Sequence, residues 1–240
     1  MKRRTFDRTL VSLAALAAAC AFAPAQAAWP DKPISIVVPY APGGTADALA
    51  RVVAQHLQTR LKTTVVVLNK AGASGVIGEG EVARAPADGY TVLLCTGSTH
   101  AVAPAVNPKL PYDNLRDFAA ITLLTVSPNV LIVNPAVPAK NVRELIDLLK
   151  ASPGKYNFAT TGIGGLPHLV TEMFMQMSGT RMTHVPFTGS APALRAVIAG
   201  SVEIAFDSIT ASPQIQAGRV RALGITRAER IAALPDVPGI

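Results

Sequence analysis

Short apolar runs are the feature of this sequence that most limits how the chain can fold. Each run is rich in Val, Ile and Leu, and most runs show no alternation between apolar and polar positions. Strands that are covered on both faces have this pattern, which favours parallel sheets flanked by helices. The runs are Ile34–Val38, Thr64–Leu68, Thr91–Cys95, Val130–Val133 and Glu203–Phe206.

Helical patterns lie between these predicted strands. In Ala46–Leu61, Leu or Val recurs every four positions. In Asn141–Lys150, Asn141 is placed to cap the helix and Glu144 follows three residues later, a variant of the capping box. Further helices are predicted at Leu169–Met177 and Ala191–Ala199. Alternating strands and helices predict the α/β class.

The strand–helix pattern occurs in two successive sets, which predicts two α/β lobes. We expect one lobe to comprise residues 28–127 plus 223–240, and the other residues 128–222. An uncharged stretch, Phe118–Ala139, joins them. Because Pro128 and Pro135 interrupt it, this stretch is predicted to form two buried strands rather than a membrane span.

Residues 1–27 have the pattern of a cleaved secretory signal peptide. A basic start precedes the apolar segment Leu10–Ala23, and a small-x-small site follows at Ala25–Ala27. The apolar segment is shorter than the roughly 20 residues that span a bilayer. Arg3 and Arg4 resemble a twin-arginine signal, so both export routes remain open. We expect the protein to be periplasmic.

Composition excludes several other classes. The chain is 50% hydrophobic and 15% charged, which excludes intrinsic disorder. The net charge of +7 falls to +4 without residues 1–27, and the basic residues are scattered, so no nucleic-acid partner is expected. Two cysteines cannot form a disulfide framework. Cys95, within an apolar run, is predicted to be a buried small hydrophobe.

The loop after the first predicted strand, Pro39–Asp47, is a candidate anion site. Its two glycines let a ligand approach the backbone, and Thr45 is placed to cap the following helix. Unpaired N–H groups and the helix dipole favour an anion at such a helix start. The alternative is an ordinary glycine turn, with Asp47 simply complementing the helix dipole.

The loop Gly97–His100 places a serine near a histidine, as in a hydrolase. A nucleophile elbow needs glycine two residues before and after the serine. Thr96 and His100 occupy those positions around Ser98. A helix cap or a hydroxyl contact is therefore favoured over serine catalysis.

Three further loops supply hydroxyls and backbone N–H groups: Thr160–His168, Pro186–Pro192 and Asp207–Ser208. Asp207 or Ser208 either caps the next helix or contacts a ligand. His168 and Glu172 share a helix face, but the other histidines stand in unrelated contexts, so no metal site is expected. No catalytic constellation or cofactor motif is present. Such loops bind small anions without transforming them.

Several motifs together resemble the Bug family, the solute-binding components of tripartite tricarboxylate transporters. The resemblance covers residues 29–240. It implies a type II periplasmic binding-protein fold, with two lobes that close on a solute. The implied partners are a small organic acid or amino acid, which is the ligand, and membrane permease subunits. The resemblance also implies that the protein is a monomer and not an enzyme. The motifs are Trp29–Ile34, Val38–Asp47, Ala85–Thr91 and Leu234–Pro238.

The resemblance and the loop positions together give one set of expected ligand-binding residues. They are Tyr40, Pro42, Gly43, Gly44, Thr45, Asp47, Ser98, Thr160, Thr161, Gly164, His168, Thr188, Gly189 and Asp207.

The sequence departs from the family pattern at three points. Gly165 stands where the family often has serine, and Thr188 stands where it often has lysine. Family members generally continue past Leu234–Pro238, so we expect a C-terminal tail that completes the first lobe to be missing from this chain. Two alternatives remain open: a ligand-sensing module that reports to a membrane receptor, and a periplasmic hydrolase using Ser98 and His100.

Overall fold

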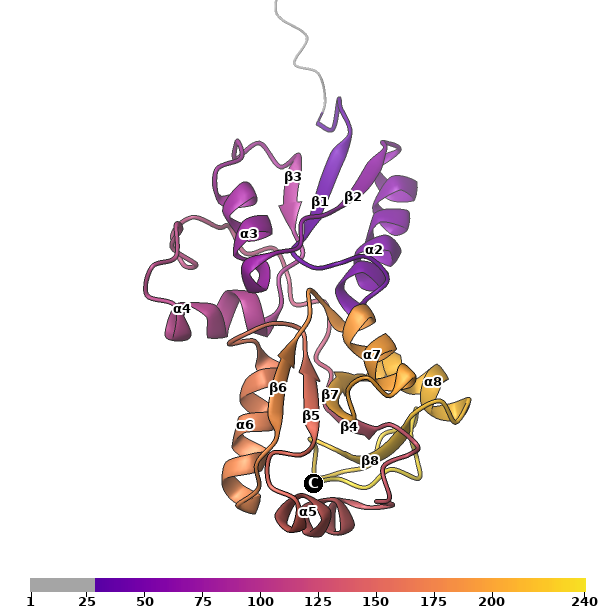
Figure 1. Cartoon of the computed structure of the whole chain (residues 1–240). Helices are drawn as coiled ribbons and strands as arrows, with labels where there is room; N and C mark the ends of the chain where they lie inside the picture. Colours follow the sequence, from indigo (N-terminus) through magenta and orange to yellow (C-terminus); the bar gives the residue numbers. More distant parts are fainter. Residues whose placement is uncertain (1–28) are drawn as a thin grey trace, which may run out of the picture. The chain divides into compact units, whose positions relative to one another are not determined.

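The computed structural model describes residues 29–240, so the predicted signal peptide lies outside the described residues. Residues from Pro33 to Ile240 form one compact unit that contains two sheets (Figure 1). The strands are β1 (Ile34–Val38), β2 (Val65–Asn69), β3 (Thr91–Leu93), β4 (Asn129–Val133), β5 (Asn157–Thr160), β6 (Thr183–Pro186), β7 (Ile204–Ser208) and β8 (Arg221–Ile225). The helices are α2 (Thr45–Leu61), η1 (Ala73–Gly75), α3 (Val76–Ala83), η2 (Gly97–Val102), α4 (Ala103–Val106), α5 (Val142–Ala151), α6 (Leu166–Ser178), α7 (Ser190–Ala199), η3 (Ile209–Ala211) and α8 (Ser212–Gln216).

The first lobe is built on a parallel three-stranded sheet in the order β2-β1-β3. Its central strand β1 is nearly all buried, which explains why four of its five residues are apolar. Helix α2 packs against the sheet through Ala46, Ala50 and Ala54, whose small side chains allow a close approach. Both β1 and α2 lie where the sequence predicts them.

The second lobe contains a five-stranded sheet in the order β6-β5-β7-β4-β8. Strand β5 runs parallel to β6 and β7, but β4 is antiparallel to β7 and β8, so the predicted parallel arrangement holds for only part of this sheet. Asn129 pairs with Ser208, so β4 begins beside the point where β7 ends. Strand β4 is the first element after the crossing from the first lobe, and it runs away from that crossing.

Both faces of β4 are covered, which explains why its apolar residues do not alternate with polar ones. Leu131 and Val133 lie in a core cluster with residues of α5 and α6. Val130 and Ile132 lie in a second cluster with residues of α7. The predicted capping of α5 is confirmed. Asn141 Oδ1 accepts the Glu144 N–H at 2.9 Å, and Glu144 Oε2 accepts the Lys140 N–H at 2.7 Å.

The prediction of two strands within Phe118–Ala139 is wrong, because only β4 forms there. Residues 119–128 have no regular secondary structure. Ile121, Leu123 and Val126 are 77%, 78% and 83% exposed. In the described part of the chain no strand pairs with this segment, so its apolar side chains remain at the surface.

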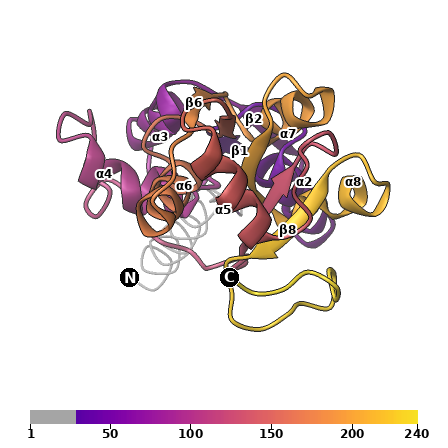
Figure 2. The same ribbon diagram turned by 60° about the horizontal axis from the view of Figure 1, so that its bottom comes forward.

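Strands β5, β6 and β8 are not among the predicted strands. Strand β8 pairs with β4, and the segment after it returns to the same sheet, where the Ile225 N–H donates to Pro238 O at 2.8 Å. Leu234 and Val237 are buried in the core of this lobe. Residues 223–240 therefore pack with the second sheet, not with the first lobe as expected (Figure 2, yellow).

Within residues 29–240, no helix is both long enough and apolar enough to cross a membrane.

Candidate functional site

Two adjoining cavities are lined by residues of both lobes. The larger cavity has a volume of about 360 Å³ and the smaller one about 220 Å³. Tyr40 and Thr161 line both cavities. Tyr40 follows β1 and Thr161 follows β5, so the cavities lie at the carboxyl ends of strands, the usual ligand position in α/β sheets.

The N-terminus of α2 reaches the larger cavity, but its cap differs from the prediction. The capping residue is Gly44, which has no side chain to offer. The Thr45 N–H donates to Ser190 Oγ of the other lobe at 3.2 Å. The next N–H group, of Ala46, has no intrahelical partner, as is usual in a first turn. Since Ala46 lines the larger cavity, a backbone donor is available there.

The Thr45 hydroxyl joins the two lobes instead of capping α2. It is hydrogen bonded to the hydroxyls of Ser208 and Thr210, with Thr45 Oγ1 2.8 Å from Thr210 Oγ1. Ser208 Oγ and Thr210 Oγ1 lie 2.6 Å apart. We call this group the hydroxyl triangle. It forms an uncharged contact beside the larger cavity.

Asp47 is a structural residue behind the first loop. Its carboxylate accepts the Gly43 N–H at 2.9 Å, pairs with Arg51 at 3.0 Å and accepts from Asn69 at 3.0 Å. Burial acts to raise the pKa of Asp47, but hydrogen bonds from Arg51, Gly43 and Asn69 outweigh it, so the pKa is lowered. These contacts hold the Pro39–Asp47 loop against the end of β2.

Ser98 makes a hydroxyl contact rather than a catalytic pair. Its Oγ accepts the N–H of Leu166, the first residue of α6, at 2.8 Å. His100 Nδ1 instead lies 3.9 Å from Oε1 of the fully buried Glu79. No hydrogen bond joins Ser98 to His100 within the described residues, so the hydrolase geometry is missing.

His168 supports the Thr160–His168 loop from behind. Its Nδ1 accepts the Gly164 N–H at 3.1 Å, and its ring stacks on that of His184 with centroids 4.1 Å apart. His184 is thus part of the same cluster, contrary to the sequence interpretation that the histidines are unrelated. Burial and the nearby His168 lower the pKa of His184 to about 4. Among residues 29–240, no group of three metal-ligating side chains gathers.

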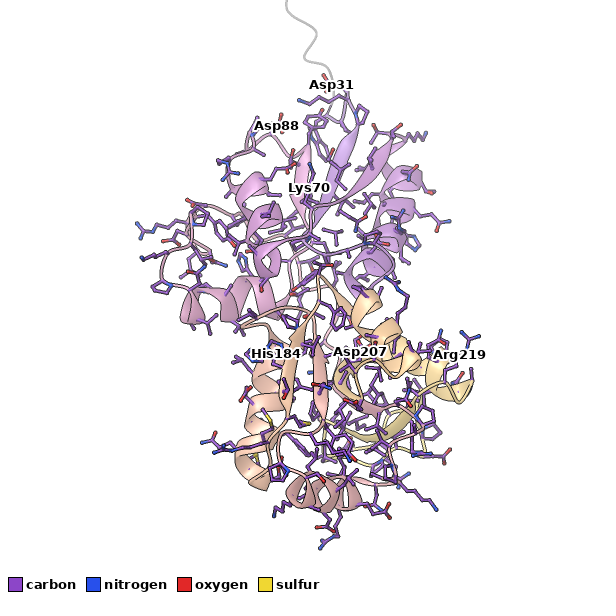
Figure 3. All side chains as sticks on the ribbon, viewed as in Figure 1. Asp31, Lys70, Asp88, His184, Asp207 and Arg219 are labelled. Atoms are coloured by element: carbon purple, nitrogen blue, oxygen red, sulfur yellow. The ribbon has the colours of Figure 1, made fainter. Side chains whose placement is uncertain are left out.

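Asp207 lies at the carboxyl end of β7 and lines the larger cavity, with an exposed fraction of 6% (Figure 3). Its Oδ1 accepts the Ser208 N–H at 2.7 Å. Burial raises the pKa of Asp207 to about 6. Neither Asp207 nor Ser208 caps the following turn η3 through its side chain.

The cavities include residues that the sequence reasoning missed. Ala73 and Ser74, in the smaller cavity, have left-handed backbones with φ of 46° and 54°. Ser74 Oγ donates to Ile163 O across the lobes at 2.8 Å. The signal was present, because this glycine-bounded loop follows the apolar run Thr64–Leu68.

The larger cavity also contains a cysteine that the sequence places in the core. Cys95 lines this cavity and is exposed. The prediction of a buried Cys95 is wrong because β3 ends at Leu93, before the thiol.

The predicted ligand-binding residues fall into two groups. Those that line a cavity are Tyr40, Gly44, Thr45, Ser98, Thr161, Thr188 and Asp207. Those outside the lining of both cavities, in the loops around them, are Pro42, Gly43, Asp47, Thr160, Gly164, His168 and Gly189.

Comparison with known proteins identifies the family. Residues 49–240 match the model of the tripartite tricarboxylate transporter family receptor. The chain belongs to this receptor family. The curated relative BugT of Bordetella pertussis is 38% identical over 88% of the chain and 65% of BugT. The chain spans about 63–65% of the length of the first curated relatives it matches.

Solved structures of family relatives confirm the two-lobed periplasmic binding-protein fold. A periplasmic transporter is 45% identical with a TM-score of 0.86, over 88% of this chain and 71% of that one. An R. palustris protein solved with adipate is 36% identical with a TM-score of 0.86, over the same shares. The periplasmic binding protein BugD is 35% identical with a TM-score of 0.82, over 88% of this chain and 71% of that one.

Proposed function

We propose that this protein binds a small carboxylate-bearing solute in the larger cavity and delivers it to the permease subunits of a tripartite tricarboxylate-type transporter. The observation that carries the proposal is a cavity lined by both lobes of a family receptor. Closure of two lobes around such a cavity excludes water from the solute.

Neutral donors in the larger cavity support binding of a carboxylate. The N-terminus of α2 presents the unpaired N–H of Ala46, and the helix dipole favours negative charge there. Hydroxyls of Thr45, Ser98, Ser190 and Ser208 line the same cavity. A carboxylate held by such donors keeps its hydrogen bonds without needing a cationic side chain.

Binding without chemical transformation agrees with the arrangement of the polar side chains. Ser98 Oγ is engaged by the Leu166 N–H, and His100 faces Glu79. No nucleophile is therefore activated by an adjacent base at this point of the cavity. The proposed location is the periplasm. The predicted signal peptide, residues 1–27, would direct export and then be cleaved.

Thermal unfolding with a panel of mono-, di- and tricarboxylates, amino acids and nicotinate-like acids tests the proposed function. A ligand at 100 times its dissociation constant adds about 2.7 kcal/mol to the free energy of unfolding. For a chain of this size the midpoint should rise by about 5–10 °C. A shift confined to one class of acids is the expected result, and a midpoint unmoved by every acid would overturn the proposal.

A further inference from the structure

The larger cavity contains one carboxylate and no cationic side chain among its lining residues. Asp207 supplies that carboxylate. Tyr40 and Cys95 are the other titratable side chains of the lining, and desolvation by the surrounding protein raises the pKa of both, although Cys95 is exposed as a residue. Both are therefore neutral at neutral pH, and neither balances the charge of Asp207.

The carboxylate of Asp207 is buried without a partner of opposite charge. Only the Ser208 N–H is hydrogen bonded to it, through Oδ1, and no group within residues 29–240 donates to Oδ2. Asp47 shows the usual arrangement, because it is 4% exposed and Arg51 pairs with both of its oxygens at 3.0 Å. Buried carboxylates ordinarily require such a partner.

No charged group on the neighbouring elements takes that role. Helices α6 and α7 pack against β7 and carry His168, Glu172 and Arg195, while β4 and β5 carry no charged residue. None of these groups contributes to the pKa of Asp207, which burial raises to about 6 and only the Ser208 N–H opposes. The charge of Asp207 is therefore left for a ligand to balance.

We propose that the solute presents a protonated amine to Asp207, so that the ligand is an amino acid rather than an organic acid that lacks an amine. This inference rests on the proposed function, since the carboxylate of the same solute binds the donors at the start of α2. An ammonium group donates to Oδ2 and supplies the missing positive charge. A carboxylate in the place of that amine would instead be repelled by Asp207, because the cavity lining lacks a cation.

Titration calorimetry of the full chain at pH 7.5 tests the proposal with matched acids. Aspartate and succinate differ by one amino group, as do glutamate and glutarate. The aminated member of a pair should bind at least about tenfold more tightly, as expected for a hydrogen bond between charged groups. Asp207→Asn, which changes few atoms, should abolish that preference. Asp147→Asn, which removes an exposed carboxylate of α5, should preserve it.

The pH dependence provides a second readout. The affinity for the aminated acid should fall as the pH is lowered from 7.5 to 5.5, because Asp207 becomes protonated with a pKa of about 6. If the affinity for the aminated acid stays constant or rises over that range, the charge of Asp207 does not bind the amine and the proposal is overturned.

The outcomes separate this inference from the proposed function. Equal or tighter binding of the acids without an amino group would overturn the amine assignment and leave solute binding intact. The same follows if the amine preference survives in Asp207→Asn. Failure of every acid, both in calorimetry and in the thermal panel, would overturn the proposed function and this inference together.

Discussion

The side-chain oxygen of Ser98 caps helix α6 from the opposite lobe, accepting the N–H of Leu166 at 2.8 Å. The residue that caps α6 by position is Gly165, which has no side chain to offer. One hydrogen bond thus satisfies a helix terminus of the second lobe and links it to η2 of the first lobe. This contact therefore contributes both to closure of the cavity and to the stability of α6.

Substitution of Ser98 should lower both the stability of the protein and its affinity for a ligand. Ser98→Ala leaves the Leu166 N–H without its partner, which should lower the free energy of unfolding by about 1 kcal/mol. The affinity for the best acid of the thermal panel should fall about fivefold. Urea unfolding and calorimetry measure the two effects. Ser201→Ala removes an exposed hydroxyl at the end of α7 and serves as the control; equal behaviour of the two variants would refute the capping role.

A side chain at Gly44 should displace the hydroxyl of Ser190. A Cβ at Gly44 would lie 2.7 Å from Ser190 Oγ, whereas a Cβ at Gly97, in the same cavity lining, meets no atom within 4 Å. The backbone of Gly44 is extended, with φ of −90°, so the conflict is purely steric. We expect Gly44→Ala to reduce ligand affinity and Gly97→Ala to leave it unchanged.

A double substitution tests this steric explanation. Combining Gly44→Ala with Ser190→Ala removes the conflicting oxygen, so calorimetry should show recovery of part of the lost affinity. If the double variant binds no better than Gly44→Ala alone, the loss has another cause.

The sequence predicts the elements whose burial is continuous. Strand β1 and helix α2 fall where expected, because a run with four apolar residues in five and a four-residue repeat each allow one interpretation. Strands β5, β6 and β8 escape prediction. They contain Asn157, Pro186 or Arg221, which interrupt any apolar run, and β6 lies at the sheet edge with no buried residue.

The site is predictable only in part. Loops at strand ends are recognisable in the sequence, and seven of the expected residues line a cavity. The pairing of Thr45 with Ser190 is not recognisable, because 145 residues separate the two and both serve equally well as helix caps. The unpaired charge of Asp207 depends on which side chains the fold gathers around it, and these come from segments far apart in the sequence.

Asp47 should contribute stability that depends on its charge. Asp47→Asn should lower the free energy of unfolding by about 1–3 kcal/mol at pH 7, because buried donors lose a charged acceptor. The folded-state pKa lies below the ordinary value of 3.8, so the contribution is present above that value and is lost as the pH falls through the folded pKa.

Urea unfolding as a function of pH tests this prediction. The difference between wild type and Asp47→Asn should be full at pH 7 and should shrink below about pH 4. Asp236→Asn, at an exposed position, is the charge-matched control. A difference that stays constant through the acid range would show that the charge of Asp47 is not involved.

The stacked histidines should make stability fall in mild acid. The pKa of His184 is about 4 in the folded protein, against 6.5 ordinarily. Between pH 4 and pH 6.5, His184 is therefore protonated in the unfolded chain and neutral in the folded one. Stability attributable to His184 is therefore full above pH 6.5 and declines as the pH falls toward 4.

Nuclear magnetic resonance and a conservative variant check this expectation. The ring protons of His184 should titrate near pH 4. His184→Gln keeps a donor for Thr160 and should flatten the pH dependence of unfolding, whereas His56→Gln, at an exposed site on α2, should not. If His184 instead titrates near its ordinary pKa of 6.5, burial beside His168 does not lower its pKa and the expectation is wrong.

The hydroxyl triangle of Thr45, Ser208 and Thr210 has a consequence for how the lobes hold together. Every hydroxyl both donates and accepts, so three mutually bonded hydroxyls can circulate their hydrogen bonds in either direction without moving a heavy atom. The closed form therefore has two proton arrangements, one for each direction of the hydrogen bonds. It keeps some entropy that a contact with a fixed donor and a fixed acceptor would lose. Because the ring carries no net charge, its strength should also be indifferent to the salt concentration around the protein.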